Sequence, residues 1–386
     1  MEADILIAGA GCAGLSLAGH LLEESRRELR LAIIDPRQDF ERDRTWCYWS
    51  LHRHPFEAAV THAWNSWRVA WEGGTSVRRS DSVSYHYLPS DAFYRLALSR
   101  LAASPDVKLV LGKRVEEIED TGDGIVARTD AGTVRARLAF DGRPPARSVP
   151  GRAGRHVALL QHFLGLLVEA DYPCFDPTTA TLMDFRVEQS EGIHFMYVLP
   201  LDRRRALVED TFFGGTPRRA DAHLESIRRY LADRCGLAAW RTLHREKGVI
   251  PMDTRIPEAR TRSRICPIGV RAGLARPASG YAFLAIQRDS VRLARLVANQ
   301  GVSGPITAAV PYGKATAFLD RVFLSYLLRQ PDQAPRLFAA LFGRVEPVSL
   351  ARFLFDGGTA ADRLRVMASL PKVALTAEAL RCLAAG

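Results

Sequence analysis

The chain has few cysteines and no long apolar run, and both shortages narrow the kinds of protein it can be. Its 386 residues include six cysteines, which are scattered and form no C-x-x-C pair. This argues against a zinc site or a disulfide scaffold and favours a reducing cytoplasm, so we expect no bound metal. No apolar run approaches the roughly 18 residues that span a bilayer. No basic segment precedes the first apolar stretch, so we expect no signal peptide.

The sequence also lacks any recognised nucleic-acid-binding motif, although it is basic. Its formal net charge is +10, with arginine clusters at 203–205 and 255–264. A nucleic acid, an anionic membrane surface and a solvated arginine-rich surface could each account for this charge. Without a motif for the first, we expect no nucleic-acid partner, and the other two interpretations stay open.

The first 35 residues follow the order strand, glycine turn, helix, strand and acid. Apolar stretches at 4–8 and 29–34 predict buried strands, and the spacing over 15–22 predicts a helix. The turn at 9–14 reads G-A-G-C-A-G. This is the dinucleotide-binding fingerprint in the structural setting that it requires.

Each glycine of the fingerprint has its own task. Gly9 permits the tight turn, Gly11 lets the backbone approach a pyrophosphate, and Gly14 lets the helix lie close to the sheet. Asp35 follows about 20 residues later, where its carboxylate would accept the ribose hydroxyls. We therefore expect these four residues to bind a dinucleotide.

A second glycine-rich segment, 268–283, lies far along the chain and contains Gly269, Gly273 and Gly280. Small residues there would let backbone amides approach a flavin. The segment resembles the one that passes the flavin ribityl chain in the flavoprotein hydroxylase and geranylgeranyl reductase superfamily, although Val270 stands where those proteins usually carry an acid. Two distant glycine motifs, without a second G-x-G-x-x-G for NADPH, favour FAD over a nicotinamide dinucleotide.

Strand-rich and helical patterns alternate beyond the fingerprint. We expect Ser90 to cap a helix that runs through Leu101. Short strands are expected at 107–111, 114–118, 125–129 and 133–140, and further helices at 221–235 and after Gly280. Beyond about residue 310 the chain is helical in pattern, with Phe/Leu-rich stripes in 315–327 and 337–342. Such stripes usually pack onto a core, with a membrane-facing role as the alternative.

These patterns predict an α/β fold: a Rossmann-type FAD-binding domain, an antiparallel-sheet substrate domain and a helical C-terminal region. The FAD-binding domain is expected to be discontinuous, at 1–155 and 257–310. Alternating strands over 156–256 predict the sheet domain, and 311–386 the helical region. We find no internal repeats.

Eight further motifs occur in a fixed order along almost the whole chain. They lie at 43–49 (DRTWCYW), 140–143 (FDGR), 160–165 (LQHFLG), 183–186 (MDFR), 195–200 (FMYVLP), 208–211 (VEDT), 248–252 (GVIPM) and 271–277 (RAGLARP). Each motif is modest alone. In this order the sequence resembles the bacterial lycopene cyclases of the flavin-dependent type.

The resemblance implies a reaction that begins with an acyclic carotenoid. Such enzymes close the ψ end of lycopene into a ring, usually the β-ring of β-carotene or γ-carotene, without net redox change. The family nevertheless requires reduced FAD, which NAD(P)H would charge. The chemistry needs an acid to protonate a terminal double bond, a dry aromatic cavity for the tertiary carbocation, and a base.

Glu209 and Asp210 are the candidate catalytic residues, because 208–211 matches the acid-rich motif of the family. On a strand their side chains point to opposite faces, so one of them can face a cavity, and the family match favours Glu209. An apolar pocket would keep that carboxyl protonated near neutral pH. The alternative is that both carboxylates are solvated or pair with the arginines at 203–205.

Other candidates come with equally open alternatives. Asp141 and Arg143 could contact the flavin phosphates or ring, or form a structural ion pair. His162 could relay a proton, although a lone histidine in an apolar strand is more often a core residue. Four aromatic residues could line a polyene tunnel and face a cation, or belong to the core: Trp46, Tyr48, Phe195 and Tyr197.

Two other functions fit parts of this pattern. A flavin-dependent monooxygenase or reductase acting on an isoprenoid would share the fold and both glycine motifs. A prenyl-chain carrier of flavoprotein fold would lack the intact fingerprint. Because lycopene lives in bilayers, we expect a cytoplasmic protein that is peripheral to the inner face of the cell membrane.

Overall fold

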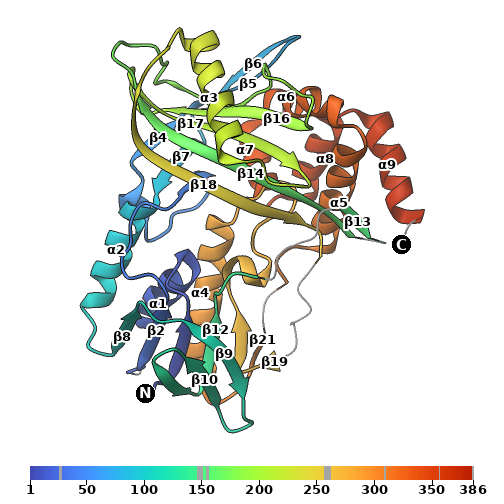
Figure 1. The fold of residues 1–386 in the computed structure, drawn as a ribbon. Coiled ribbons are helices and arrows are strands. Elements are labelled where there is room, and N and C mark those ends of the chain that lie inside the picture. Colours follow the sequence, from blue (N-terminus) through green and yellow to red (C-terminus); the bar gives the residue numbers. More distant parts are fainter. Residues whose placement is uncertain are drawn as a thin grey trace.

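The computed structural model describes residues 1–25, 28–145, 151–153, 156–255, 262–307, 310–355 and 357–384. A parallel sheet with its helices forms one end of the molecule, and a larger sheet with the helical tail forms the other (Figure 1). This arrangement is the predicted α/β fold.

Five strands form the parallel sheet in the order β20-β12-β1-β2-β8. Their bounds are Ile5–Ala8 for β1, Leu31–Asp35 for β2, Val107–Leu111 for β8, Leu138–Asp141 for β12 and Ile265–Pro267 for β20. The alternate side chains of β1 and β2 are buried on both faces, as in doubly covered parallel sheets. Helices α1 (Cys12–Glu24) and α4 (Phe283–Gln300) pack against each other over one face.

An antiparallel three-stranded sheet covers the other face of the parallel sheet. It comprises β9 (Val115–Asp120), β10 (Ile125–Thr129) and β11 (Gly132–Ala136). The strands expected near 107–129 are present, but the single strand expected at 133–140 is wrong. That stretch divides into β11 and β12, because the chain leaves the small sheet and enters the parallel one.

The helix expected at Ser90 is α2 (Ser90–Ala102), but Ser90 is not its cap. Pro89 holds the N-cap position, and the Ser90 hydroxyl instead accepts hydrogen bonds from the backbone amides of Asp43, at 2.9 Å, and Arg44, at 3.2 Å. The buried hydroxyl therefore fixes the loop before β3 (Thr45–Trp49) rather than the helix terminus.

The second sheet is eight-stranded, in the order β13-β14-β17-β16-β15-β5-β6, with β18 paired to β14. Its strands are β5 (Ser66–Trp71), β6 (Gly74–Arg79), β13 (Gly151–Ala153), β14 (His156–Glu169), β15 (Thr179–Asp184), β16 (Ile193–Pro200), β17 (Arg205–Gly214) and β18 (Arg241–Asp253). The β15–β5 pair is parallel, and the other named pairs are antiparallel. The sheet thus takes β5, β6 and β13 from the segment that we assigned to the FAD-binding domain.

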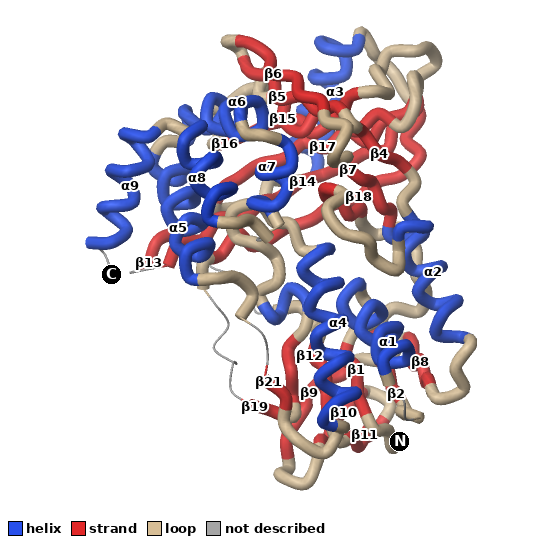
Figure 2. Tube along the Cα trace, turned by 180° about the vertical axis from the view of Figure 1, so that it is seen from behind, coloured by secondary structure: helices blue, strands red, loops and turns tan. Residues whose placement is uncertain are grey.

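The two faces of this sheet have different covers (Figure 2). Helix α3 (Ala220–Cys235), which matches the predicted helix, packs against one face through Ile227 and Leu231. The opposite face meets a small sheet and the helical tail. The small sheet contains β3, β4 (His62–Trp64) and β7 (Tyr85–Pro89). The tail contains α5 (Lys314–Arg329), α6 (Ala334–Arg344), α7 (Pro347–Leu354), α8 (Ala360–Ser369) and α9 (Lys372–Ala384).

The Phe/Leu stripe of α6 packs onto the sheet. Leu337, Phe338, Leu341 and Phe342 are all buried, in a cluster with Phe213. This stripe belongs to the core, so it offers no membrane-facing surface. Among the described residues, no helix is both long and apolar enough to cross a bilayer.

Candidate active site

The glycine turn between β1 and α1 leaves room in front of the helix. A Cβ at Gly14 would lie 2.0 Å from the carbonyl oxygen of Gly9, so a side chain there is excluded. Gly11 is the N-cap of α1, and no side chain of the described residues caps it. A Cβ added at Gly11 would meet none of their atoms within 4 Å. The helix N-terminus therefore faces open space, as an anionic phosphate requires.

Asp35 lies at the end of β2 beside this turn. Its carboxylate accepts hydrogen bonds from the amide of Ala10, at 2.7 Å, and from the amide and side chain of Arg37, at 2.9 and 2.8 Å. Burial alone would raise the pKa of Asp35, but the bonds from Arg37 outweigh it and hold the pKa below the ordinary value. The lowered pKa favours the ionised form, and a contact with a ribose stays a prediction.

The second glycine segment meets the first in space. Gly269 and Gly273 flank a short 3-10 turn, η2 (Gly269–Ala272), after β20, and a Cβ at Gly269 would lie 2.8 Å from that of Ala13. A Cβ at Gly280 would lie 3.2 Å from Gln161 Oε1, so this end of the segment approaches the large sheet. The structure thus brings together two motifs that the sequence separates.

Asp141 and Arg143 form an ion pair with each other. Arg143 Nη2 lies 2.8 Å from Asp141 Oδ2, and Arg143 Nη1 donates to the carbonyl of Glu116 at 2.9 Å. Arg271 Nε lies 2.9 Å from the same carboxylate. Of the two alternatives, this geometry favours structural pairing; a contact with flavin stays a prediction.

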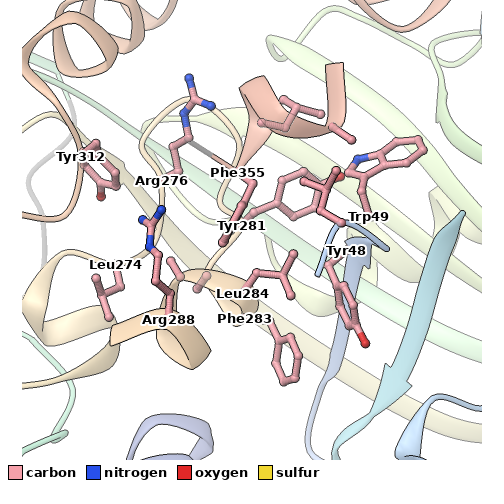
Figure 3. A pocket seen from close by; sticks show the side chains of 15 residues that line it. Tyr48, Trp49, Leu274, Arg276, Tyr281, Phe283, Leu284, Arg288, Tyr312 and Phe355 are labelled. Atoms are coloured by element: carbon pink, nitrogen blue, oxygen red, sulfur yellow. The ribbon is translucent and has the colours of Figure 1, made fainter. Parts of the chain in front are cut away.

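A mainly apolar pocket opens between the start of α4, β3 and α7 (Figure 3). Its empty volume, which includes space open to solvent, is about 450 Å³. Tyr48 stacks on Phe283 in its wall, with ring centroids 4.8 Å apart and planes 19° apart. Arg276 is buried there by an ion pair of 2.8 Å with Asp320 of α5, which ties the glycine segment to the helical tail.

Glu209 and Asp210 point to opposite faces of β17, as alternation predicts. Glu209 lies in a row of paired residues across four strands, Tyr197, Glu209, Gly165 and Glu246. Its side chain is buried, and burial, followed by the neighbouring carboxyl of Glu246, raises the pKa of Glu209 well above the ordinary value. Both its burial and the Glu246 carboxyl favour the neutral, proton-donating form of this group.

A chain of tyrosine hydroxyls leads from this row to the pocket. Tyr197 donates to the hydroxyl of Tyr85 at 2.8 Å, and the hydroxyls of Tyr85 and Tyr281 lie 3.2 Å apart. Tyr281 lines the pocket. Burial raises the pKa of Tyr197 and Tyr85 well above the ordinary value, so both are neutral donors. Hydrogen bonds therefore connect Tyr197, the neighbour of Glu209 on β16, with the apolar pocket, which Glu209 itself does not line.

Asp210 occupies a polar environment on the face under α3. His194 Nε2 contacts one carboxylate oxygen, and His223 Nδ1 lies 2.7 Å from the other. Burial would raise the pKa of Asp210, but the bonds from His194 and then His223 lower it below the ordinary value. Asp210 is an ionised anchor there, and it is turned away from the Glu209 row.

His162 lies on the Asp210 face, so it cannot relay a proton to Glu209 through the sheet. Its ring stacks on Phe212, with centroids 5.5 Å apart and planes 3° apart. Burial, and then the neighbouring His223, lowers the pKa of His162 to about 4. It is a core histidine, which was the other alternative.

The four predicted aromatic residues do not gather in one cavity. Trp46 packs edge-on against Phe93, at 5.1 Å, and Tyr48 lines the pocket. Phe195 is buried in the core against Phe213, at 5.3 Å. Tyr197 stands beside Glu209.

Alternate residues of β3 face the carboxyl row, which comprises Tyr197, Glu209, Gly165 and Glu246. The Thr45 hydroxyl donates to Glu246 Oε2 at 2.9 Å, and the Cys47 thiol interacts electrostatically with Glu209 and Glu246. The sequence interpretation missed Glu246 and Tyr85. A carboxylate at an alternating position next to the GVIPM motif was the available signal.

The fold defines the class of protein. Over 97% of the chain it is similar to a geranylgeranyl bacteriochlorophyll reductase-like protein from Thermoplasma acidophilum, with a TM-score of 0.62, 11% identity and 98% of that chain covered. A probable FAD-dependent monooxygenase from Pseudomonas aeruginosa is also similar, with a TM-score of 0.55, 18% identity, and 96% and 99% of the two chains covered. The chain thus has the fold of these two proteins.

The sequence defines the family within this class. Residues 4–380 match the lycopene cyclase protein family, and the chain belongs to it. Lycopene beta-cyclase of Pantoea ananas is 25% identical over 391 residues, which cover 97% of this chain and 96% of that protein. Lycopene beta-cyclase of a Paracoccus species is 27% identical over 411 residues, which cover 99% and 97%.

Proposed function

We propose that the protein is a lycopene beta-cyclase, which closes the ψ end groups of lycopene to β-rings in a redox-neutral reaction. The observation that carries this proposal is the buried Glu209 carboxyl, whose neutral form is favoured by its surroundings, in a chain of this family. A carbon–carbon double bond is a weak base, so its protonation needs an acid that is neutral, correctly placed and shielded from water.

Glu209 would donate the proton to the terminal double bond. The resulting tertiary cation is attacked by the internal double bond, which closes the six-membered ring, and loss of a ring proton completes the isomerisation. The pocket walls around Tyr48 and Phe283 would exclude water and offer aromatic faces to the cation. Tyr281 joins that pocket to the Glu209 row through Tyr85.

Both glycine segments suit FAD. The open space at Gly11 would admit the pyrophosphate, Gly14 keeps α1 close, and Asp35 would accept ribose hydroxyls. Gly269 and Gly273 would allow a close approach from the other side. When it is bound and reduced, FAD would supply an electron-rich ring that stabilises positive charge in the site. We propose that the reduced form is the active one and that NAD(P)H supplies its electrons.

We further propose that the protein is cytoplasmic and lies on the inner face of the cell membrane, from which its apolar substrate would come. The tail carries the supporting surface. Val373, Leu380 and Leu383 of α9 are 87%, 62% and 60% exposed, and Lys372 and Arg381 lie beside them. Exposed apolar residues next to basic ones suit an anionic lipid surface, as does the net charge of +10.

Anaerobic incubation of the purified protein with lycopene and chemically reduced FAD tests the activity. Chromatography should show γ-carotene or β-carotene, with no consumption of reductant per ring closed. Products that carry oxygen, or that need NAD(P)H and oxygen stoichiometrically, would instead identify a monooxygenase. Unchanged lycopene under all these conditions would contradict the proposal.

A further inference from the structure

Gly165 lies at the centre of the carboxyl row and separates two glutamates. In β14 it pairs with Glu209 of β17 on one side and with Glu246 of β18 on the other. Directly paired residues of antiparallel strands project to the same face. Both carboxyl groups therefore project to the same face, on either side of a residue that has no side chain.

The missing side chain lets the two glutamates meet. A Cβ at Gly165 would lie 2.8 Å from Glu209 Cγ, 3.1 Å from Glu246 Cγ and 3.2 Å from Glu209 Oε1. The two side chains thus lean over Gly165 from opposite sides, and the carboxyl of Glu246 acts on that of Glu209. A side chain at this position would occupy the space between them, so glycine lets the two carboxyls come together.

The surroundings of the pair hold it away from water. Glu209 and Glu246 are 8% and 4% exposed. Thr45 and Cys47 of β3 and Tyr197 of β16 supply polar groups at the row.

The charged and titratable groups farther out lie toward Glu246. Tyr87 of β7 and His244 of β18 both interact electrostatically with Glu246 and with Arg42. For Glu209, the charged group that acts most strongly is Glu246 itself. Two carboxylates in hydrogen-bonding contact repel strongly when both are ionised, so such a pair retains one proton.

We propose that Glu246 is a positioning residue for Glu209, and that the two carboxyl groups share one proton across Gly165 as the proton source of the cyclisation. This inference rests on the proposed function. A single buried carboxyl would serve as an acid only up to the pH at which burial alone keeps it protonated. The second carboxyl raises that pH and orients the acidic hydrogen of Glu209.

The proposed cyclisation needs no proton donor or acceptor besides the carboxyl pair. The pair begins with one proton, and Glu209 transfers it to the CH carbon of the terminal double bond, whose electrons form the new C–H bond and leave the tertiary cation on the dimethyl-substituted carbon. The internal double bond attacks this cation, so the ring's C–C bond forms and the positive charge moves to a ring carbon. A ring proton leaves, its C–H electrons form the ring double bond, and the proton returns to Glu209. No electrons are gained or lost, as an isomerisation requires.

The substitution Glu246→Gln tests the inference through the pH profile. It keeps the side-chain volume and the bond from Thr45, but it removes the neighbouring negative charge. Glu209 should then ionise at lower pH, and the alkaline limb of the cyclisation rate should move down by about one pH unit or more. Activity near neutral pH should fall and recover in acid. A merely structural role would lower the rate equally at every pH.

Infrared difference spectroscopy gives a readout that does not depend on turnover. The wild-type protein should show a protonated carboxyl band at about pH 7 that Glu209→Gln removes. In Glu246→Gln this band should disappear at a lower pH than in the wild type. Glu169→Gln, in the same strand as Gly165 but half-buried and paired with the exposed Arg241, is the matched control and should change neither measurement.

Gly165→Ala provides a second route if Glu246→Gln folds poorly. Its Cβ would push the carboxyls apart while both remain, so the band should again titrate at lower pH. An active wild type whose profile and band are unaffected by Glu246→Gln and Gly165→Ala would overturn the shared proton alone. An inactive wild type that nevertheless shows the expected infrared shifts would overturn the proposed function and leave the pair intact.

Discussion

The two faces of the large sheet shift the pKa values of two neighbouring carboxyl groups in opposite directions. On the face covered by β3 and β7, the strongest electrostatic neighbour of Glu209 is another carboxyl, Glu246, and the pKa of Glu209 rises. On the face covered by α3, His194 and His223 bind Asp210, and its pKa falls despite burial. Two adjacent residues of one strand therefore have pKa values that are shifted in opposite directions.

The difference teaches that burial alone does not decide protonation. Both side chains are almost inaccessible to water, and desolvation favours the neutral form of each. The hydrogen-bond partners decide the outcome, and strand alternation assigns each carboxyl its own set. The proposed chemistry and the anchoring of α3 can therefore share one strand without interfering.

The largest effect is expected from Gly11→Val, which should disable the Glu209 face and leave the Asp210 face intact. The valine would fill the space in front of α1 without touching described protein atoms, and the backbone angles at this position, φ −79° and ψ −168°, suit it. We expect a folded protein with almost no bound FAD, measured by flavin absorbance and circular dichroism. Gly19→Ala, also with open space around it, is the control. Full flavin content in Gly11→Val would contradict the assignment of the glycine turn as part of the FAD-binding site.

Glu209→Gln should have the next largest effect. The amide keeps the size of the side chain but cannot donate an acidic proton, so cyclisation should fall at least about a hundredfold. Binding of reduced FAD, followed by its spectrum, should be unchanged. Asp210→Asn should reduce turnover much less, because Asp210 lies on the other face. If the two variants exchanged these phenotypes, the assignment of acid and anchor would be reversed.

Asp210→Asn should instead lower the free energy of unfolding, by about 1–3 kcal/mol, since a buried histidine donor loses its charged acceptor. The depressed pKa of Asp210 gives the sign of the pH dependence. Stabilisation by the carboxylate is complete above the ordinary value of 3.8 and is lost as the pH falls through the lower folded value. The difference between wild type and variant should therefore shrink in acid.

Thermal unfolding at several pH values measures this contribution. Asp221→Asn, an exposed acid at the start of α3, is the matched control and should change stability by less than about 0.5 kcal/mol. If the free energy of unfolding of Asp210→Asn stays below that of the wild type by the same amount down to strongly acidic pH, lost packing rather than lost charge destabilises the variant.

The parts of the site that depend on local sequence were predictable. Gly9, Gly11, Gly14 and Asp35 belong to one strand–turn–helix–strand unit, and the structure has that unit where the spacing predicted it. The opposite orientation of Glu209 and Asp210 also follows from strand alternation alone.

What the sequence could not supply is register between distant strands. Glu246 faces Glu209 because β18 and β17 pair with the same residue of β14, and no local pattern encodes that match. Trp46 and Phe195 illustrate the same limit, because aromatic spacing cannot tell a pocket wall from a core. The Ser90 hydroxyl looked like a helix cap, but it bonds to a loop that a local pattern does not place beside it.

The smallest expected effect concerns the outer surface of the tail, whose inner surface covers the Glu209 face. Helix α9 lies at the edge of the molecule near the described C-terminal end (Figure 1). Val373→Ser combined with Leu380→Ser should weaken binding to anionic vesicles a few-fold, because each side chain would insert only part of its apolar area, worth about 1 kcal/mol. Val77→Ser, on the exposed strand β6 and with 55% exposure, is the control.

Added salt should weaken vesicle binding of the wild type and both variants, because it screens the basic residues. Equal vesicle binding by the wild type and the double variant, at low and high salt, would place the membrane contact elsewhere, and no binding by any of them would remove it. If the wild type binds vesicles and the double variant binds them less, the apolar substrate would reach the large sheet from the side of the tail. The two faces of the sheet would then differ both in the protonation of their carboxyl groups and in their access to lycopene.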